Sequence, residues 1–129
     1  MFDVNDLVGK VVVGDSLVEE LRNLPSLILE WGNKLAQAQT EVMKIKLKLK
    51  VLEGSKDLEV RRSPGLYGLD KITESAVQSA VASCPDVRAL QEELIKAEEE
   101  ETFCKAVLDS LYVKKDVLGG LITLKTGGI

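Results

Sequence analysis

The sequence predicts a mainly α protein: a long antiparallel helical hairpin with coiled-coil-type seams, a short middle helix, minor short strands and a tendency to oligomerise. Two heptad-spaced runs of apolar residues predict the hairpin, and the glycine- and proline-containing stretch between them predicts its connector. The 129 residues suit one small helical domain, residues 1–129. Within it, residues 1–15 are expected to form an N-terminal arm.

The first long helix is expected over residues 16–53. Its apolar seam alternates spacings of four and three without a polar interruption, a pattern that chance seldom produces. Ser16 and Glu19 form a capping box at its start, and Gly54 is expected to end it. The seam consists of Leu17, Leu21, Leu24, Ile28, Trp31, Leu35, Ala38, Val42, Ile45, Leu49 and Leu52.

Two features inside this helix compete with a regular helical pattern. Pro25 has no backbone N–H, so we expect a kink or a break there, with the long helix proper beginning nearby. Residues 43–51 alternate apolar side chains with lysines, as a half-buried strand would. The heptad pattern runs through these residues from far upstream and favours a helix, in which Leu47 is left exposed.

A connector is expected over residues 54–72, because they hold three glycines and a proline. Residues 58–61 are expected to form a short strand within it. Thr73 then caps a short helix over residues 73–83. The apolar face of this helix is Ala76, Val77, Ala80 and Val81.

The second long helix is expected over residues 84–118 and is opened by Pro85 and Asp86. Two polar members of its seam, Glu101 and Lys115, weaken the seam or fix its register. Glycines end the helix, and a short strand over residues 121–125 is expected in the tail, residues 119–129. The seam consists of Val87, Leu90, Leu94, Ala97, Glu101, Cys104, Leu108, Leu111, Lys115 and Leu118.

The residue inventory argues against enzymatic activity. The chain has no histidine, which excludes histidine bases, Ser-His and Cys-His nucleophile pairs and His-ligated metal sites. Cys84 and Cys104 are too few for an all-cysteine zinc site, and the seam position of Cys104 predicts a core thiol. Residues 9–16 have the glycine spacing of a phosphate-binding loop, but Asp15 replaces its lysine. We expect no cofactor, no metal and no nucleotide site.

Charge is segregated along the chain. Residues 44–62 hold seven basic residues against three acidic ones, whereas residues 92–101 hold six glutamates and one lysine. A basic strip of this kind can follow a phosphate backbone. Aromatic residues for base stacking are missing, Tyr67 being the nearest, so nucleic-acid binding is expected to be electrostatic and salt-sensitive. The candidate nucleic-acid-binding residues are Lys44, Lys46, Lys48, Lys50, Lys56, Arg61 and Arg62.

A second interpretation of the same lysines stays open. With Leu21 and Leu24 at heptad positions a and d, Lys46 and Lys48 flank the seam at e and g. A hairpin brings these two lysines toward the acidic stretch of the second helix, where they can form ion pairs. The glutamates at the matching e and g positions are Glu93, Glu98 and Glu100, and the cations without such obvious partners are Lys44, Lys50, Lys56, Arg61 and Arg62.

Residues 31–45 resemble the first long helix of a known family. The stretch Trp31-Gly32-Asn33-Lys34, followed by Glu41 and Lys44-Ile45, is similar to that of the UvsY recombination mediators of T-even-type phages. A linker, a short helix with small residues and an Asp-Val before a long helix follow in similar order. The family's Lys-Ala-Arg-Leu tetrad, which contacts DNA, is absent, because its place falls at residues 54–57, where Lys56 alone is basic.

The resemblance implies a non-enzymatic accessory of DNA recombination and repair. Such mediators assemble into rings, bind single-stranded DNA and help a recombinase to displace single-strand-binding protein. Its implied partners are single-stranded DNA, a recombinase, single-strand-binding protein and further copies of the chain. No signal peptide or membrane span is expected, so the implied location is cytoplasmic, in the host if the protein is phage-encoded. Two other classes stay open: a structural coiled-coil scaffold or adaptor, and a prefoldin-like chaperone with short strands at the helix ends.

Overall fold

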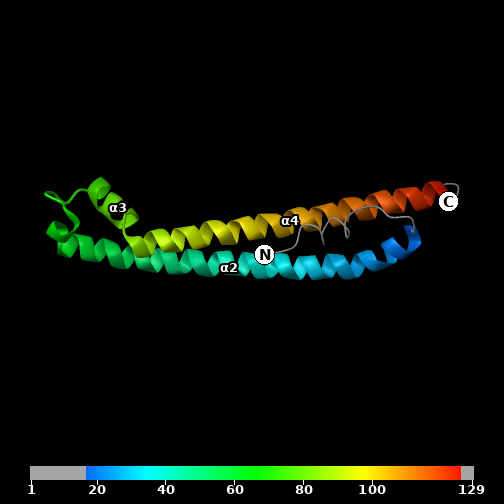
Figure 1. Cartoon of the computed structure of the whole chain (residues 1–129), viewed down its shortest axis with the longest axis horizontal. Helices are drawn as coiled ribbons and strands as arrows, with labels where there is room; N and C mark the ends of the chain where they lie inside the picture. The colour runs from blue at the N-terminus through cyan, green and yellow to red at the C-terminus, as the bar shows by residue number, and fades with distance from the viewer. Residues whose placement is uncertain (1–16, 126–129) are drawn as a thin grey trace. The chain divides into compact units, whose positions relative to one another are not determined.

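The computed structural model describes residues 17–125, which form α2 (Leu17–Arg62), the 3-10 helix η1 (Pro64–Tyr67), α3 (Glu74–Ala82) and α4 (Pro85–Lys125) (Figure 1). Residues 17–125 contain no strand, and the prediction of a mainly α fold is confirmed. No helix in this range is long and apolar enough to cross a membrane. The predicted arm, the capping residue Ser16 and the loop-like residues 9–16 lie outside the described range.

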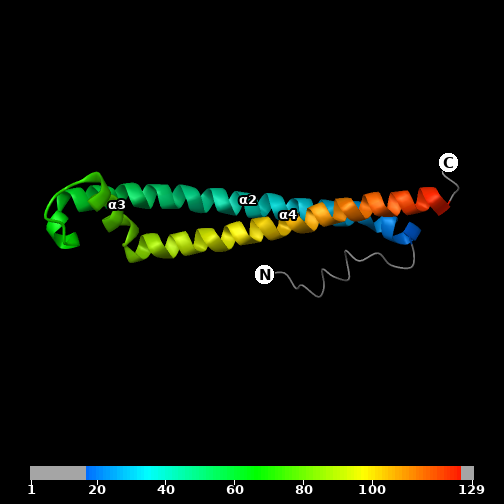
Figure 2. The same cartoon turned by 90° about the horizontal axis from the view of Figure 1, so that it is seen from above.

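The chain forms two compact units, and both long helices contribute to each. The terminal unit holds residues 17–39 of α2 and residues 99–125 of α4, and the connector unit is Thr40–Glu98. Within each unit α2 and α4 lie side by side, as the two views show (Figures 1 and 2).

In the terminal unit the two helices are antiparallel. Glu20 of α2 pairs with Lys114 of α4, and Trp31 of α2 contacts Phe103 of α4 edge to face, with ring centroids 6.3 Å apart. Residue numbers therefore rise along one helix as they fall along the other. The buried core between them consists of Leu24, Trp31, Ala38, Cys104, Val107, Leu111 and Leu118.

The connector unit has two smaller cores. One lies between the long helices and is formed by Val42, Ile45 and Ala97, with Leu90 and Leu94 packed against it. The other joins the end of α2 to α3 and the start of α4. It consists of Val60, Val77, Val81, Cys84 and Val87.

Local sequence explains the short helix between the long ones. The Thr73 side chain accepts a hydrogen bond from the Ala76 N–H, which caps α3 as predicted. Val77 and Val81 are buried on the predicted apolar face. Before it, η1 ends at Gly68, whose φ of 71° is the left-handed conformation that glycine adopts without strain.

The predicted seam of the first helix agrees closely with the observed burial. All of its members are buried or half-buried, and Leu47, which falls outside it, is 64% exposed. Residues 43–51 are helical and not a strand, as the heptad pattern favoured.

Both long helices extend further than predicted. α2 continues through Gly54 to Arg62, which replaces the strand expected over residues 58–61. A glycine costs a helix about 1 kcal/mol, and the complete burial of Val60 beyond it outweighs that cost. α4 continues through Gly119 and Gly120 to Lys125 and replaces the second expected strand. No proline follows the two glycines to stop the helix.

Pro25 lies inside α2 without ending it. The ring removes one backbone hydrogen bond, yet the neighbouring Leu24 is 1% exposed in the terminal core. Burial on both sides of the proline holds the two segments in one helix. The helix bends in its first turns, shown blue in Figure 1.

One polar member of the second seam was wrongly assigned. Lys115 is exposed, whereas Lys114 is 6% exposed and lies at a seam position, three residues after Leu111 and four before Leu118. Both choices satisfy a three-four spacing, so the pattern alone does not separate them. The acidic partner Glu20 decides the register, because Lys114 reaches its carboxylate at 3.2 Å.

Candidate nucleic-acid interface

Four of the predicted site residues form a continuous set of exposed cations on α2. Lys44, Lys46, Lys48 and Lys50 all belong to the connector unit and are all exposed. Within the described range none of these four side chains makes an ion pair. No acidic residue occurs over residues 42–52, so the surrounding helix does not neutralise them. Their charges are therefore available to an anionic partner.

The four lysines lie in two rows. Residues four apart share one side of a helix and are about 6 Å apart along its axis. Lys44 and Lys48 therefore form one row, and Lys46 and Lys50 form the other. Arg62 is exposed at the end of the same helix and likewise makes no ion pair with the residues that the structure places.

Lys56 and Arg61 have partners, contrary to the expectation from the sequence. Lys56 lies 3.3 Å from Asp86 and 3.4 Å from Glu59, and hydrogen bonding to Asp86 raises its pKa. Asp86 stands at the start of α4, so this pair joins the end of α2 to that helix. Glu59 also accepts a hydrogen bond of 3.0 Å from the Tyr67 hydroxyl, which raises the pKa of Tyr67.

Arg61 also contacts two carboxylates within the connector unit. Its guanidinium lies 2.7 Å from Asp57 and 2.8 Å from Glu74, and these hydrogen bonds raise its pKa above the usual value. Glu74 is the first residue of α3, so Arg61 ties that helix to α2. Lys56 and Arg61 thus hold the connector unit together and are poor candidates for phosphate contacts.

The predicted pairing of Lys46 and Lys48 with the glutamates of the second helix is not found. Neither lysine makes an ion pair within residues 17–125. The position of the two lysines on α2 explains this, because the apolar residues Ile45 and Leu49 occupy the positions nearest to α4. The two lysines are directed away from that helix and stay exposed.

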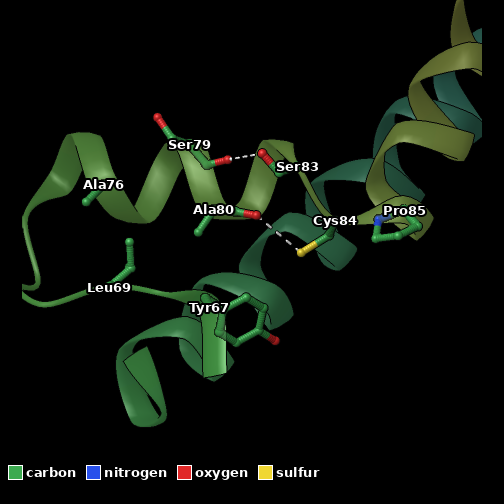
Figure 3. Close-up of a pocket in the computed structure, with 8 residues that line it drawn as sticks. All are labelled: Tyr67, Leu69, Ala76, Ser79, Ala80, Ser83, Cys84 and Pro85. Atoms are coloured by element: carbon green, nitrogen blue, oxygen red, sulfur yellow. Dashed lines mark hydrogen bonds between the residues drawn. The ribbon is translucent and has the colours of Figure 1, made fainter. Parts of the chain in front are cut away.

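A hollow in the connector unit lies between η1 and α3. Its volume is about 410 Å³, and Figure 3 shows the Tyr67 ring on one side of it and the small residues of α3 on the other. Several polar groups in its wall are engaged elsewhere: Ser83 donates to the Ser79 carbonyl at 2.8 Å, Cys84 donates to the Ala80 carbonyl at 3.4 Å, and the Tyr67 hydroxyl donates to Glu59. None of the described residues that line it is charged, so it does not suit a phosphate group.

Both cysteines are core residues. Cys84 and Cys104 are free thiols and are buried in separate cores. Burial raises the pKa of Cys104, which keeps its thiol protonated and unreactive. Among the described residues, no group of three or more acidic or cysteine side chains could hold a metal ion.

Sequence reasoning missed three more exposed apolar residues beside the lysines. Met43, Val51 and Leu58 are 71%, 66% and 57% exposed, in addition to Leu47. Met43, Leu47 and Val51 follow one another at a spacing of four residues, which places these three on one side of α2. That spacing is visible in the sequence, but the alternation with lysines obscures it.

Comparison with known proteins identifies the same fold in solved structures. No family model and no curated protein matches the sequence. Three crystal structures of the bacteriophage T4 recombination mediator protein UvsY are similar to this chain at 18% sequence identity. Lattice type IV gives a TM-score of 0.78 over 97% of this chain and 94% of that one, and lattice type II gives 0.75 over 98% and 97%. Lattice type I gives 0.74 over 97% of each chain, so this chain has the fold of the T4 mediator over nearly its whole length.

Proposed function

We propose that this protein is a recombination mediator: a non-enzymatic, oligomeric accessory that binds single-stranded DNA. In this role it helps to load a recombinase onto single-stranded DNA that is coated with single-strand-binding protein. The observation that carries the proposal is the set of exposed lysines without ion pairs on a fold shared with a recombination mediator. These lysines are Lys44, Lys46, Lys48 and Lys50.

The chemistry of binding follows from the two lysine rows. Each lysine that contacts a phosphate releases condensed counterions, which makes the affinity high at low salt and weak at high salt. Arg62 extends the basic surface toward the connector. Lys56 and Arg61 contribute charge nearby while their side chains stay engaged with carboxylates.

Oligomerisation is supported by a second exposed apolar surface in the terminal unit. Val113, Val117 and Leu121 follow one another at a spacing of four on α4 and are 62%, 45% and 39% exposed. We call these three residues the α4 ridge. A ridge of this kind is costly to leave in water and suits contact with a second copy of the chain. Several copies would multiply a weak DNA surface into a strong one.

The binding step is tested by fluorescence anisotropy of a labelled oligo(dT) with the full chain at low and moderate salt. Tight binding that weakens steeply as salt rises supports the proposal. A variant with Lys44→Gln and Lys48→Gln is expected to bind more weakly. The matched control is Lys105→Gln, an exposed lysine on α4 in the other unit, which is expected to bind like the wild type.

The mediator step is tested separately. The protein is added to single-stranded DNA coated with single-strand-binding protein, and the growth of the recombinase filament is followed. Faster filament growth with the wild type than with the lysine variant supports the proposal. If the wild type does not accelerate filament growth, the protein binds DNA but does not act as a mediator.

A structural coiled-coil subunit is the second candidate, and the continuous heptad seam of α2 favours it. It predicts an assembly that forms without DNA and ignores oligo(dT) at low salt. The prefoldin-like chaperone loses its main support, because the strands expected near the helix ends are helical in the described residues.

A further inference from the structure

The face of α2 that points away from α4 carries an apolar ridge among the lysines. We call Met43, Leu47 and Val51 the α2 ridge; they are 71%, 64% and 66% exposed. The opposite side of the same turns provides the buried residues Val42 and Ile45, so the ridge takes no part in the core of the connector unit. Three large exposed apolar side chains in a line are typical of a surface that contacts a partner.

The charges around this ridge restrict what can cover it. The row of Lys44 and Lys48 lies on one side, and the row of Lys46 and Lys50 lies on the other. A second copy docking through the same ridge would bring eight lysines together without a carboxylate between them, and like charges oppose that contact.

The acidic part of α4 is a poor partner as well. It has complementary charge, but of the large apolar residues described on α4 within the connector unit only Ile95 is exposed, at 58%. A surface with one apolar side chain leaves most of a three-residue ridge in water. The four lysines favour an occupant that is long, negatively charged at its edges and apolar along its middle.

We propose that the α2 ridge receives the bases of single-stranded DNA whose phosphates lie along the lysine rows. This inference rests on the proposed function and adds a second kind of contact to it. The faces of all four bases are apolar, so packing on aliphatic side chains contributes affinity without selecting a sequence. In other proteins that bind single strands, aromatic side chains pack against the bases. This chain has no aromatic residue beside the lysines, and the α2 ridge would make these contacts instead.

The two contacts differ in their response to salt, which allows them to be separated. Phosphate contacts set the slope of affinity against salt concentration, whereas apolar contacts with bases shift the affinity and leave that slope unchanged. The two contacts also respond differently when the bases are removed from the oligonucleotide. An abasic oligonucleotide of equal length keeps every phosphate but has no base that could contact the α2 ridge.

The test compares oligo(dT) with the abasic oligonucleotide on the full chain, using a variant with Met43→Ala, Leu47→Ala and Val51→Ala. Alanine keeps the helix, and the three positions are exposed, so the fold is expected to survive. The matched control is Leu29→Ala, which removes a 67% exposed leucine from α2 away from the lysines. Light scattering on each variant reports the assembly size.

We expect the triple variant to lose affinity for oligo(dT) by about fivefold or more, with an unchanged salt slope and unchanged abasic binding. The control is expected to match the wild type throughout. Equal affinities of wild type and triple variant for oligo(dT) would overturn the inference and leave the proposed function standing. A fall in assembly size in the triple variant would assign the ridge to a protein contact and overturn it too. Failure of the wild type to bind either oligonucleotide would overturn both.

Discussion

Lys114 of α4 donates a hydrogen bond to Glu20 of α2 at 3.2 Å, although the lysine is only 6% exposed. The pair lies beside the apolar core of the terminal unit, where an unpaired charge is costly. It also fixes the register of the two helices, because a shift by one residue would leave Lys114 without this carboxylate.

Removing one member of this pair is expected to destabilise the protein. Glu20→Ala removes the carboxylate that the buried Lys114 ammonium contacts, and it is expected to lower the free energy of unfolding by about 1–3 kcal/mol. Lys114→Met keeps the volume of the side chain and leaves Glu20 with access to water, so its effect is expected to be near zero. Urea unfolding followed by the fluorescence of Trp31, the single tryptophan, measures both changes. Equal losses in the two variants would contradict this account.

The two kinds of cation on α2 are expected to respond differently to neutralisation. Arg61→Gln breaks the contacts with Asp57 and Glu74, so it loosens α3 and shifts the urea midpoint slightly downward. Lys48→Gln breaks no ion pair and leaves the midpoint unchanged.

DNA binding is expected to show the reverse pattern. Lys48→Gln weakens binding to oligo(dT) and lowers its salt slope, whereas Arg61→Gln changes neither appreciably. Anisotropy titrations at several salt concentrations separate the two variants. A larger effect of Arg61→Gln on the salt slope would place the DNA at the connector instead of on the lysine rows.

Stability is expected to fall in alkaline solution, in part through Cys104. Burial raises the pKa of this thiol above its usual 9.0 in the folded chain. As the pH passes 9.0, the thiol ionises in the unfolded chain before it ionises in the folded one, so proton release favours unfolding. The contribution is complete below that pH and is lost as the pH rises through the folded pKa. Urea midpoints of the wild type and Cys104→Ala, measured from neutral to alkaline pH, should show a shallower decline in the variant.

The α4 ridge is expected to control assembly. Val113→Asp and Val117→Asp place charges on this surface, and they are expected to reduce the mass found by light scattering. The α2 ridge offers a matched control, because Leu47→Asp changes an apolar residue that is 64% exposed, close to the 62% of Val113. Unchanged mass in the α4 variants would contradict the assignment of oligomerisation to this ridge.

The heptad rule predicted most of the fold because burial follows helical periodicity closely. Every expected seam residue of α2, from Leu17 to Leu52, is buried or half-buried. Helix ends were predicted less well. Gly54 and Gly119 are weak stop signals by themselves, and the burial of Val60 that carries α2 past Gly54 depends on α3, which local sequence does not reveal.

The sequence indicated which segment carries the positive charge, but not which of its cations make ion pairs. Charge counting located the lysines, yet it could not distinguish Lys48, which is free of ion pairs within the described chain, from Lys56, whose partner Asp86 lies thirty residues away. Such long-range contacts need the fold. The resemblance to UvsY-type mediators agreed with the fold, since solved T4 UvsY structures match nearly the whole chain.

The most direct test of the central claim is the salt dependence of oligo(dT) binding by the wild type and by a variant with all four lysines, Lys44, Lys46, Lys48 and Lys50, changed to glutamine. The account predicts that the logarithmic salt slope falls by up to about 0.7 for each lysine that contacts a phosphate in each bound protomer. It also predicts that the urea midpoint stays the same, because these side chains make no ion pairs in the described structure. An unchanged salt slope in the variant, or wild-type binding that ignores salt, would contradict it.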